Sequence, residues 1–321
     1  MKNIPVLHIE EESLAKAYEN ALIELYNKGT RFSTQYDKEG DPKSIDATMN
    51  ITVLNPMAEP MIHKAFPGGI ADLKEYVMEL EGCKDHWVKN LNDPQDTRWE
   101  YTYHGRFSRY GQWKEKECHY ITKCNHNLRD KHHTDKCYLD VYTEDYWKGF
   151  VNQGIDQFES VVEKLCDQPF TRQAQMITWM PNLDLDCYDP PCLQSIWFRI
   201  LEDDDGVQWL NYDVRFRSND AWGAFFMNAF GISMMVKELV ADKIAEKTGK
   251  TVKLGRMNWQ ADSWHIYGKD IQAFKERLFD RLDKTEFEDR VYNFDDEMIQ
   301  SIYNEAEADV MAKLKKYDEE H

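Results

Sequence analysis

Basic residues, long apolar runs and linker segments are all scarce in this 321-residue chain. Lys and Arg total 40 against 58 Asp and Glu, which gives a formal net charge of -18 at pH 7. Because phosphate neutralisation drives non-specific DNA binding, this balance argues against a duplex-coating surface, although a few arginines suffice for a small anion. No apolar stretch approaches the ~20 residues that cross a bilayer, and the N-terminal segment lacks the basic and apolar regions of a signal peptide. We therefore expect a cytoplasmic protein that binds neither nucleic acid nor membrane.

The paired ligand motifs of structural zinc sites are also missing. Seven Cys is an odd number, so free thiols are expected rather than a disulfide framework. An insertion near 114–140 is rich in metal-ligating side chains, namely Cys118, His119, Cys124, His126, His132, His133 and Cys137. Their spacing lacks the C-x2-C or H-x3-H clips of structural zinc sites, so a polar surface insertion is favoured over a metal centre.

The remaining composition is typical of a globular protein. With 42% hydrophobic and 13% aromatic residues, the chain can bury a full-sized core without disulfides or metal. No segment rich in Pro, Gly or Ser divides it, and no repeat is present. We predict one domain over residues 1–321, with the Cys/His-rich insertion near 114–140 and an acidic C-terminal extension over 285–321.

Hydrophobic periodicity predicts helices interspersed with strands. Apolar residues recur at helical spacing in 10–28, 70–80, 154–166, 223–246 and 271–282. Strand-like patterns occupy 45–53, 173–180, 195–200, 208–218 and 252–259. The acidic remainder is predicted to be a solvated helix or a frayed tail. Together these patterns predict a mixed α+β fold around a large sheet.

One cysteine stands out by its position. In Asp189-Pro190-Pro191-Cys192 the thiol follows two residues of fixed φ at a strand end, so it is held rigidly. A cysteine becomes nucleophilic when neighbouring cations lower its pKa, and the strand that ends near Arg217 could supply that charge. Taken alone, the motif fits a buried, inert cysteine better than a nucleophile.

The order of the motifs is more specific than any one of them. Five follow one another along the chain: Thr171-Arg172-Gln173, Pro190-Pro191-Cys192, Arg217-Ser218-Asn219-Asp220, Asn228 and His265-Ile266-Tyr267. In this order the chain resembles the thymidylate synthase superfamily, which includes the pyrimidine nucleotide hydroxymethylases. The stretches DPPCLQ, FRSNDAWGA and YHGRF look most like archaeal-type thymidylate synthases and phage hydroxymethylases. The resemblance covers about 45–283. It implies a three-layer fold with a large mixed sheet and flanking helices, and a homodimer with sites shared across the interface.

The resemblance also implies a covalent mechanism. Cys192 would add to C6 of a pyrimidine deoxynucleotide monophosphate, so that C5 can attack the methylene of 5,10-methylenetetrahydrofolate. Arg217 and Ser218 would bind the 5′-phosphate, and Arg172 would reach the same phosphate from the neighbouring subunit.

Base, sugar and folate contacts follow from the same alignment. Asn228 matches the base-reading asparagine, whose carbonyl accepts from N3–H of uracil while its amide donates to O4. Cytosine presents the opposite pattern, so Asn228 favours a uridylate substrate. His265 and Tyr267, two apart on one strand face, would hold the ribose 3′-hydroxyl. Asp220 and Trp99 would contact the folate.

Two further side chains would handle protons. Glu75 lies off the apolar stripe of its helix and aligns with the glutamate that organises water and proton transfer around the base. On position alone, a surface glutamate is the commoner interpretation. Tyr103 aligns with the tyrosine that helps to remove the C5 proton, and Tyr110-Gly111-Gln112-Trp113 competes for that alignment.

The chain departs from the family pattern near the nucleotide. Leu193, Gln173 and Phe216 each replace a residue that is usually polar. The N-terminal phosphate contact stays open between Arg31 and Lys38, and the Lys38 stretch looks slightly closer to the hydroxymethylase version.

The C-terminal segment bears most directly on the product. In thymidylate synthases a short apolar tail keeps water from the methylene intermediate, so that hydride from the folate completes a methyl group. The acidic segment here ends in Lys-Lys-Tyr-Asp-Glu-Glu-His and looks unsuited to sealing a dry cavity. The first hypothesis is therefore a dUMP hydroxymethylase that makes 5-hydroxymethyl-dUMP, as for modified phage DNA. The alternatives are a thymidylate synthase that makes dTMP, a (d)CMP hydroxymethylase and a non-catalytic nucleotide-binding homologue.

Overall fold

The computed structural model describes residues 3–34, 37–89, 95–111, 154–185 and 187–320. The Cys/His cluster of 118–137 lies outside the described residues, so the interpretation of that insertion stays a prediction. None of the helices within the described ranges is both long and apolar enough to cross a membrane.

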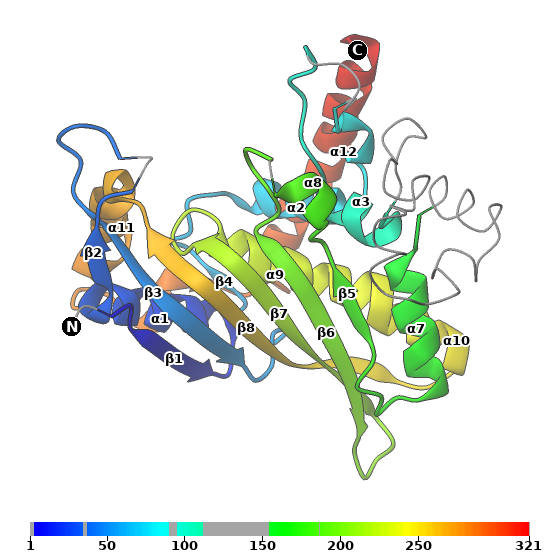
Figure 1. Cartoon of the computed structure of the whole chain (residues 1–321). Helices are drawn as coiled ribbons and strands as arrows, with labels where there is room; N and C mark the ends of the chain where they lie inside the picture. The colour runs from blue at the N-terminus through cyan, green and yellow to red at the C-terminus, as the bar shows by residue number, and fades with distance from the viewer. Residues whose placement is uncertain (1–2, 35–36, 90–94, 112–153, 186, 321) are drawn as a thin grey trace, which may run out of the picture.

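A seven-stranded mixed sheet forms the centre of the fold, in the order β1-β3-β8-β7-β6-β5 with β2 also paired to β3 (Figure 1). Its strands are β1 (Val6–Glu11), β2 (Thr30–Phe32), β3 (Ser44–Val53), β5 (Gln175–Ile177), β6 (Leu193–Glu202), β7 (Gln208–Asp220) and β8 (Val252–Ile266). β1 with β3 and β7 with β8 run parallel, and the other neighbours run antiparallel. A separate two-stranded sheet joins β4 (Ile62–His63) to β9 (Val291–Tyr292).

Helices cover one face of the large sheet in two further layers. They are α1 (Leu14–Lys28), α2 (Ile70–Leu80), α3 (Tyr103–Ser108), α7 (Gln157–Asp167), α8 (Pro181–Asp184), α9 (Phe225–Val236), α10 (Asp242–Thr248), α11 (Ile271–Arg277) and α12 (Glu297–Glu320). α1 packs on β1 and β3, α2 packs on α9, and α12 packs on α2. The predicted three-layer α+β fold with a mixed sheet is confirmed.

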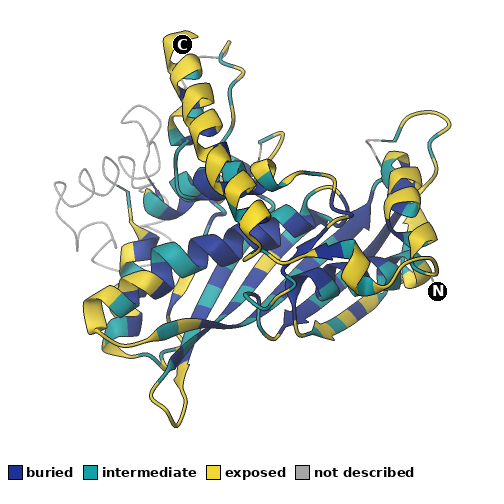
Figure 2. Cartoon of the chain, turned by 180° about the vertical axis from the view of Figure 1, so that it is seen from behind, coloured by how far each residue is buried: buried dark blue, intermediate teal, exposed yellow. Residues whose placement is uncertain are grey.

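α9 lies at the centre of the hydrophobic core, as its apolar sequence predicts (Figure 2). Phe225 contacts Trp259 and Trp264 of β8 edge-on, with ring centroids 5.1 and 5.4 Å apart. Trp259 in turn stacks on Phe216 of β7 at 4.6 Å. These aromatic contacts fix the start of α9 against the strand ends that carry the candidate site.

The acidic C-terminal segment differs from its prediction. Residues 297–320 form one long helix, which packs through an apolar stripe of Ile299, Tyr303, Ala306, Val310 and Leu314. The predicted helix is therefore confirmed and the frayed tail is wrong, but because this stripe docks on α2 the helix is not solvated all round. Its charged residues occupy the remaining faces, which explains why composition alone hid the stripe.

The strand directions bring the motifs to one edge of the sheet. β7 and β8 are parallel and both end there, at Asp220 and Ile266, whereas the antiparallel β6 and β3 begin there, at Leu193 and Ser44. Residues far apart in sequence therefore meet along the upper edge in Figure 1.

Candidate active site

Cys192 immediately precedes β6, in a turn held by Arg217 of β7. The Arg217 backbone N–H donates to the Cys192 carbonyl at 2.9 Å. Its guanidinium folds over the same turn, with Nε 3.0 Å from the Pro191 oxygen and Nη2 2.5 Å from the Pro190 oxygen. The arginine therefore fixes the backbone around the thiol and brings its positive charge to it.

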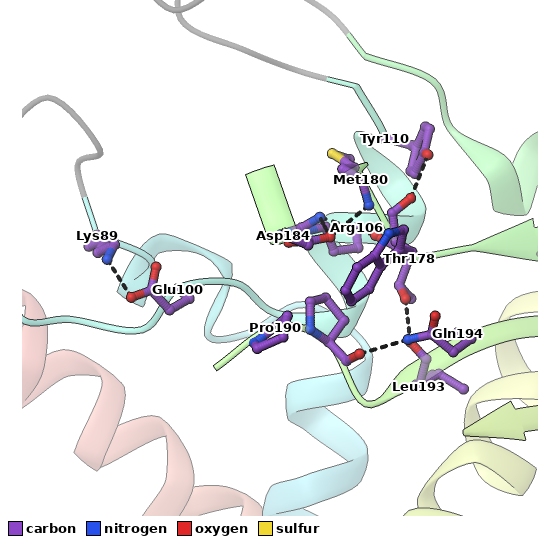
Figure 3. A network of polar contacts seen from close by, with 12 residues as sticks. Lys89, Glu100, Arg106, Tyr110, Thr178, Met180, Asp184, Pro190, Leu193 and Gln194 are labelled. Carbon is purple, nitrogen blue, oxygen red and sulfur yellow. Dashed lines mark hydrogen bonds and ion pairs between the residues drawn. The ribbon is translucent and has the colours of Figure 1, made fainter. Parts of the chain in front are cut away.

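A buried network supports this turn from behind (Figure 3). Arg106 of α3 forms a two-pronged ion pair with Asp184 of α8, at 3.0 and 2.7 Å, and also donates to the Thr178 carbonyl at 3.1 Å. The Thr178 hydroxyl donates to the Leu193 carbonyl, and the Gln194 side chain donates to the Pro191 carbonyl at 2.7 Å. The chain on both sides of Cys192 is thus tied to the core.

The structure separates the two candidate tyrosines. The Tyr103 hydroxyl accepts from the Leu193 N–H at 3.3 Å and so lies beside the thiol, whereas the Tyr110 hydroxyl donates to the Trp179 carbonyl at 2.9 Å. Burial raises the pKa of Tyr103, and the Cys192 charge raises it further. Burial also raises the pKa of Cys192, while the charge of Arg217 opposes that shift. Arg217 therefore favours the thiolate that a nucleophile requires.

Asn228 lies in the first turns of α9, with its carboxamide enclosed. Its Oδ1 accepts from Asn219 Nδ2 at 3.0 Å, and its Nδ2 donates to the Tyr76 hydroxyl at 2.6 Å. Three elements, β7, α2 and α9, therefore fix the side chain predicted to read the base.

His265 belongs to a polar row that crosses three strands. Asp46 of β3, His265 of β8 and Asp220 of β7 lie opposite one another in the sheet register. The Ser263 hydroxyl donates to Asp46 at 2.7 Å and lies 3.3 Å from His265 Nδ1. Burial lowers the pKa of His265, and its buried Nε2 has no hydrogen-bond partner within the described ranges. A neutral imidazole with a free ring nitrogen suits a ligand hydroxyl. Tyr267 lies beside it, with ring centroids 4.6 Å apart.

Asp220 ends β7 and caps the turn that leads into α9. It accepts from the backbone N–H groups of Trp222 and Gly223 at 3.1 and 2.8 Å. Burial raises the pKa of Asp220 to about 6, in spite of these hydrogen bonds. A partly protonated carboxyl at this edge can either donate to or accept from a heterocycle.

Glu75 lies between two lysines that come from opposite directions. Its Oε1 is 2.9 Å from Lys84 Nζ, and its Oε2 is 2.5 Å from Lys313 Nζ on α12. Burial alone would raise the pKa of Glu75, but the hydrogen bonds and charges of Lys313 and Lys84 outweigh it and hold the pKa below its ordinary value. Lys84 is itself buried and also contacts Glu79 at 3.1 Å.

Trp99 is 40% exposed beside this ion-pair cluster. Its ring centroid lies 5.5 Å from the Lys84 ammonium and 5.5 Å from the Trp87 ring, which stacks on Tyr317 of α12 at 4.3 Å. An exposed indole next to Glu75 offers a flat apolar surface to an aromatic ligand.

Two of the predicted phosphate contacts, Ser218 and Lys38, lie near the same edge of the sheet. Ser218 follows Arg217 on β7 and pairs with Ser263 in the sheet. Lys38 is exposed in the loop before β3, where Ser44 ties Asp37 to the Gly268 N–H that follows Tyr267. That loop shares the sheet edge with the other residues.

The other predicted phosphate contacts are Arg31 and Arg172. The Arg31 guanidinium lies 5.1 Å from the Tyr26 ring centroid, which leaves Lys38 as the better-placed of the two N-terminal candidates. Arg172 is exposed near β5, and its guanidinium makes no hydrogen bond or ion pair with any described residue. Among the described residues, no group of three or more His, Cys, Asp or Glu side chains could hold a metal ion.

Comparison with known proteins identifies the family of this chain. The family model described as thymidylate synthase matches residues 43–320. The chain belongs to the thymidylate synthase family. A thermostable thymidylate synthase A from Bacillus subtilis shares the fold, with a TM-score of 0.51 and 16% identity over 83% of this chain and 84% of that one.

Several archaeal members of the thymidylate synthase family are related in sequence. A protein of Methanocaldococcus jannaschii, provisionally named a thymidylate synthase, is 27% identical over 82% of this chain and 91% of its own length. A protein of the same name from Methanothermobacter marburgensis is 30% identical over 43% of this chain. The aligned regions of the first such relatives span only about half of their length, 48–61%.

Some residues of this thymidylate synthase family site escaped sequence reasoning. Asn219, Tyr76, Lys84, Lys313 and the Arg106–Asp184 pair all hold predicted residues in place. Asn219 and Arg106 lie inside motifs that the sequence analysis already used, so their position beside predicted site residues could have identified them. Lys313 lies 238 residues from its partner Glu75, and no local pattern could have joined them.

Proposed function

We propose that this chain transfers a one-carbon unit from 5,10-methylenetetrahydrofolate to C5 of a pyrimidine deoxynucleotide monophosphate. The observation that carries the proposal is the Cys192 turn. A rigid thiol with Arg217 over its backbone and the Tyr103 hydroxyl beside it shares one sheet edge with Asn228 and His265. This arrangement supplies a nucleophile, a cation and a base-reading amide in one place.

The proposed reaction begins when the Cys192 thiolate adds to C6 of the base. The electron pair of the C5–C6 double bond then makes C5 nucleophilic, and C5 attacks the methylene carbon of the folate, whose C–N bond breaks. Tyr103 assists loss of the C5 proton. The electron pair of that C–H bond forms the exocyclic methylene double bond as the second C–N bond breaks and releases tetrahydrofolate. Asn228 holds the uracil edge, His265 and Tyr267 hold the 3′-hydroxyl, and Arg217, Ser218 and Lys38 face the phosphate. Asp220 and Trp99 contact the folate, and Glu75 organises water and proton transfer around the base.

We infer that water completes the reaction and that the product is 5-hydroxymethyl-dUMP. The groove between α2 and α12 beside Glu75 supports this choice. It has a volume of about 420 Å³, and Asp72, Asp309, Lys313 and Lys316 are among its lining residues. Charged walls hold water. Water adds to the exocyclic methylene carbon, the C5–C6 double bond forms again and the Cys192 thiolate leaves C6. The product carries a hydroxymethyl group, and the folate has already left as tetrahydrofolate.

The second candidate is methylation of dUMP to dTMP, and the names of the archaeal relatives favour it. In that reaction the folate supplies hydride and leaves as dihydrofolate. One incubation of the purified protein with methylenetetrahydrofolate and dUMP or dCMP separates the candidates. Mass spectrometry of the nucleotide and absorbance of dihydrofolate are the readouts. We expect a hydroxymethyl mass gain on dUMP without dihydrofolate. A methyl gain with dihydrofolate would establish the second candidate, and an unchanged nucleotide would refute both.

We further propose that two copies of the chain pair through the face of the large sheet that lies opposite the helices. Trp197, Trp209, Arg215 and Arg256 lie on that face with their side chains at least partly exposed. In such a dimer, the exposed Arg172 would reach the partner's phosphate site. Light scattering should give twice the monomer mass, and Arg172→Ala should weaken nucleotide binding without changing that mass. A monomeric protein of full activity would contradict this proposal.

A further inference from the structure

The carboxamide of Asn228 is held in one orientation by two neighbours. Asn219 Nδ2 donates to its Oδ1 at 3.0 Å, and its own Nδ2 donates to the Tyr76 hydroxyl at 2.6 Å. A carboxamide has two N–H groups and two lone pairs on oxygen, so one of each remains for a ligand. Asn228 and Asn219 are only 9% and 4% exposed, so bulk water cannot replace these partners freely.

Tyr76 is fixed as firmly as Asn219. Gly231 of α9 lets its ring lie against the helix, because a Cβ added there would come within 2.6 Å of Tyr76 Cδ1. The hydroxyl is therefore delivered to Asn228 by packing and not by a mobile side chain.

Asn219 carries a second sign of a specific role. Its Oδ1 is buried and has no hydrogen-bond partner within the described part of the chain. A buried acceptor without a donor costs free energy, and an aliphatic residue of similar size would avoid that cost. What the amide does provide is a donor to Asn228.

We propose that Asn219, assisted by Tyr76, determines which pyrimidine this protein accepts, because it fixes which atom of the Asn228 carboxamide faces each edge position of the base. The inference rests on the proposed function, in which Asn228 reads the base. Uracil offers a donor at N3 and an acceptor at C4, and cytosine offers the reverse. Rotating the carboxamide by a half-turn exchanges its oxygen and nitrogen and so exchanges the base that fits. Asn219 and Tyr76 are positioning residues, since they act through Asn228.

The substitution Asn219→Asp tests this idea with almost no change of shape. An ionised carboxylate only accepts, so Asn228 must turn its Nδ2 toward residue 219. Its Oδ1 then accepts from the Tyr76 hydroxyl, which can donate as well as accept. The turned carboxamide presents the pattern that cytosine needs.

The experiment measures dissociation constants for dUMP and dCMP by calorimetry at mildly alkaline pH. We expect the unsubstituted protein to prefer dUMP, and Asn219→Asp to move the ratio of the two constants toward dCMP by at least about tenfold. Asn219→Ala should bring the ratio toward one, and Tyr76→Phe should shift it less, because Asn219 still holds the oxygen. The matched control is Asn211→Asp, since Asn211 also lies on β7 and donates to the Trp209 carbonyl, away from the motif edge. It should leave the ratio unchanged.

The outcomes distinguish this inference from the proposed function. An unchanged ratio in Asn219→Asp and Asn219→Ala, with normal dUMP binding, overturns the inference and leaves the proposed function standing. If the unsubstituted protein binds neither nucleotide, the proposed function fails and takes the inference with it. Circular dichroism monitors folding of each variant. If Asn219→Asp does not fold, the ratios for Asn219→Ala and Tyr76→Phe decide, because a merely structural role would weaken both nucleotides equally.

Discussion

The nucleotide side of the candidate site and the side formed by α2 and α12 are built in different ways. The first consists of strand ends and turns whose side chains bond to partly or fully buried backbone, as Arg217 does to the carbonyls of Pro190 and Pro191. The second depends on ion pairs between helices, one of which places the 60% exposed Lys313 on Glu75.

This difference teaches where the site is rigid and where it can adjust. Buried hydrogen bonds in a sheet keep their geometry in any salt concentration, whereas exposed ion pairs are screened and exchange with water. The proposed nucleophile therefore lies on the rigid side of the site. The proton handling that we propose for Glu75 lies where solvent and the C-terminal helix can tune it.

On the nucleotide side, the largest expected loss of turnover comes from removing the nucleophile. Cys192→Ser should lower turnover by about ten-thousand-fold or more, because a hydroxyl in this turn is a far weaker nucleophile than a thiolate. The dissociation constant for dUMP should change by less than about threefold, since serine preserves the shape of the turn. Steady-state assays and calorimetry provide the two readouts.

Cys187→Ser is the matched control, because Cys187 lies in the same segment, five residues before the nucleophile. It should retain nearly full turnover. Equal losses in both variants would mean that the segment is merely sensitive to substitution, and surviving turnover in Cys192→Ser would contradict the covalent mechanism.

The Arg106–Asp184 ion pair behind the Cys192 turn should contribute strongly to the free energy of unfolding. Arg106→Met leaves the carboxylate of Asp184 buried without its partner, and we expect a loss of about 3–5 kcal/mol in the free energy of unfolding. Urea denaturation measures it. Lys237→Met removes an exposed ion pair with Asp242 and should cost at most about 1 kcal/mol. Similar losses in the two variants would show that the Arg106 network does not hold the turn.

The sequence could predict the nucleotide side because its residues lie in compact motifs. The alternation in 208–218 placed Arg217 on the face opposite Leu210 and Phe216, and the structure confirms that arrangement. The prediction for β8 stopped at Trp259, but the strand continues to Ile266. Polar residues such as Asp262 and Ser263 hid its last part, and these residues are polar because they belong to the uncovered face and the motif edge.

The α2–α12 side could not be predicted in the same way. The apolar stripe of α12 is diluted by acidic residues, so composition suggested a solvated segment. Lys313 of α12 reaches Glu75 of α2 only because these two helices dock on each other. A local sequence pattern carries no information on that docking. Asp46 is a similar case. Its strand was predicted, but its place beside Ser263 and His265 comes from sheet register alone.

The smallest expected effect is on the pH dependence of turnover, and it concerns the side of the site formed by α2 and α12. Lys313→Met removes one of the two cations that hold the pKa of Glu75 down, so that pKa should rise. If turnover needs the ionised carboxylate, its acid limb should move to higher pH at low salt, and the shift should be small because Lys313 is largely exposed. Adding salt should produce a similar shift in the unsubstituted protein and a smaller one in the variant.

Glu307→Gln is the control that separates charge from docking. Glu307 pairs with Lys74 across the same two helices at 2.9 Å and does not touch Glu75. If α12 acts on Glu75 through the Lys313 charge, Glu307→Gln should leave the acid limb in place. An equal shift in both variants would instead assign the effect to the docking of α12, and no shift in Lys313→Met would remove Glu75 from the pH dependence altogether. In each case the nucleotide side should keep its dUMP affinity, because none of the hydrogen bonds given above for Cys192, Asn228 and His265 involves α12.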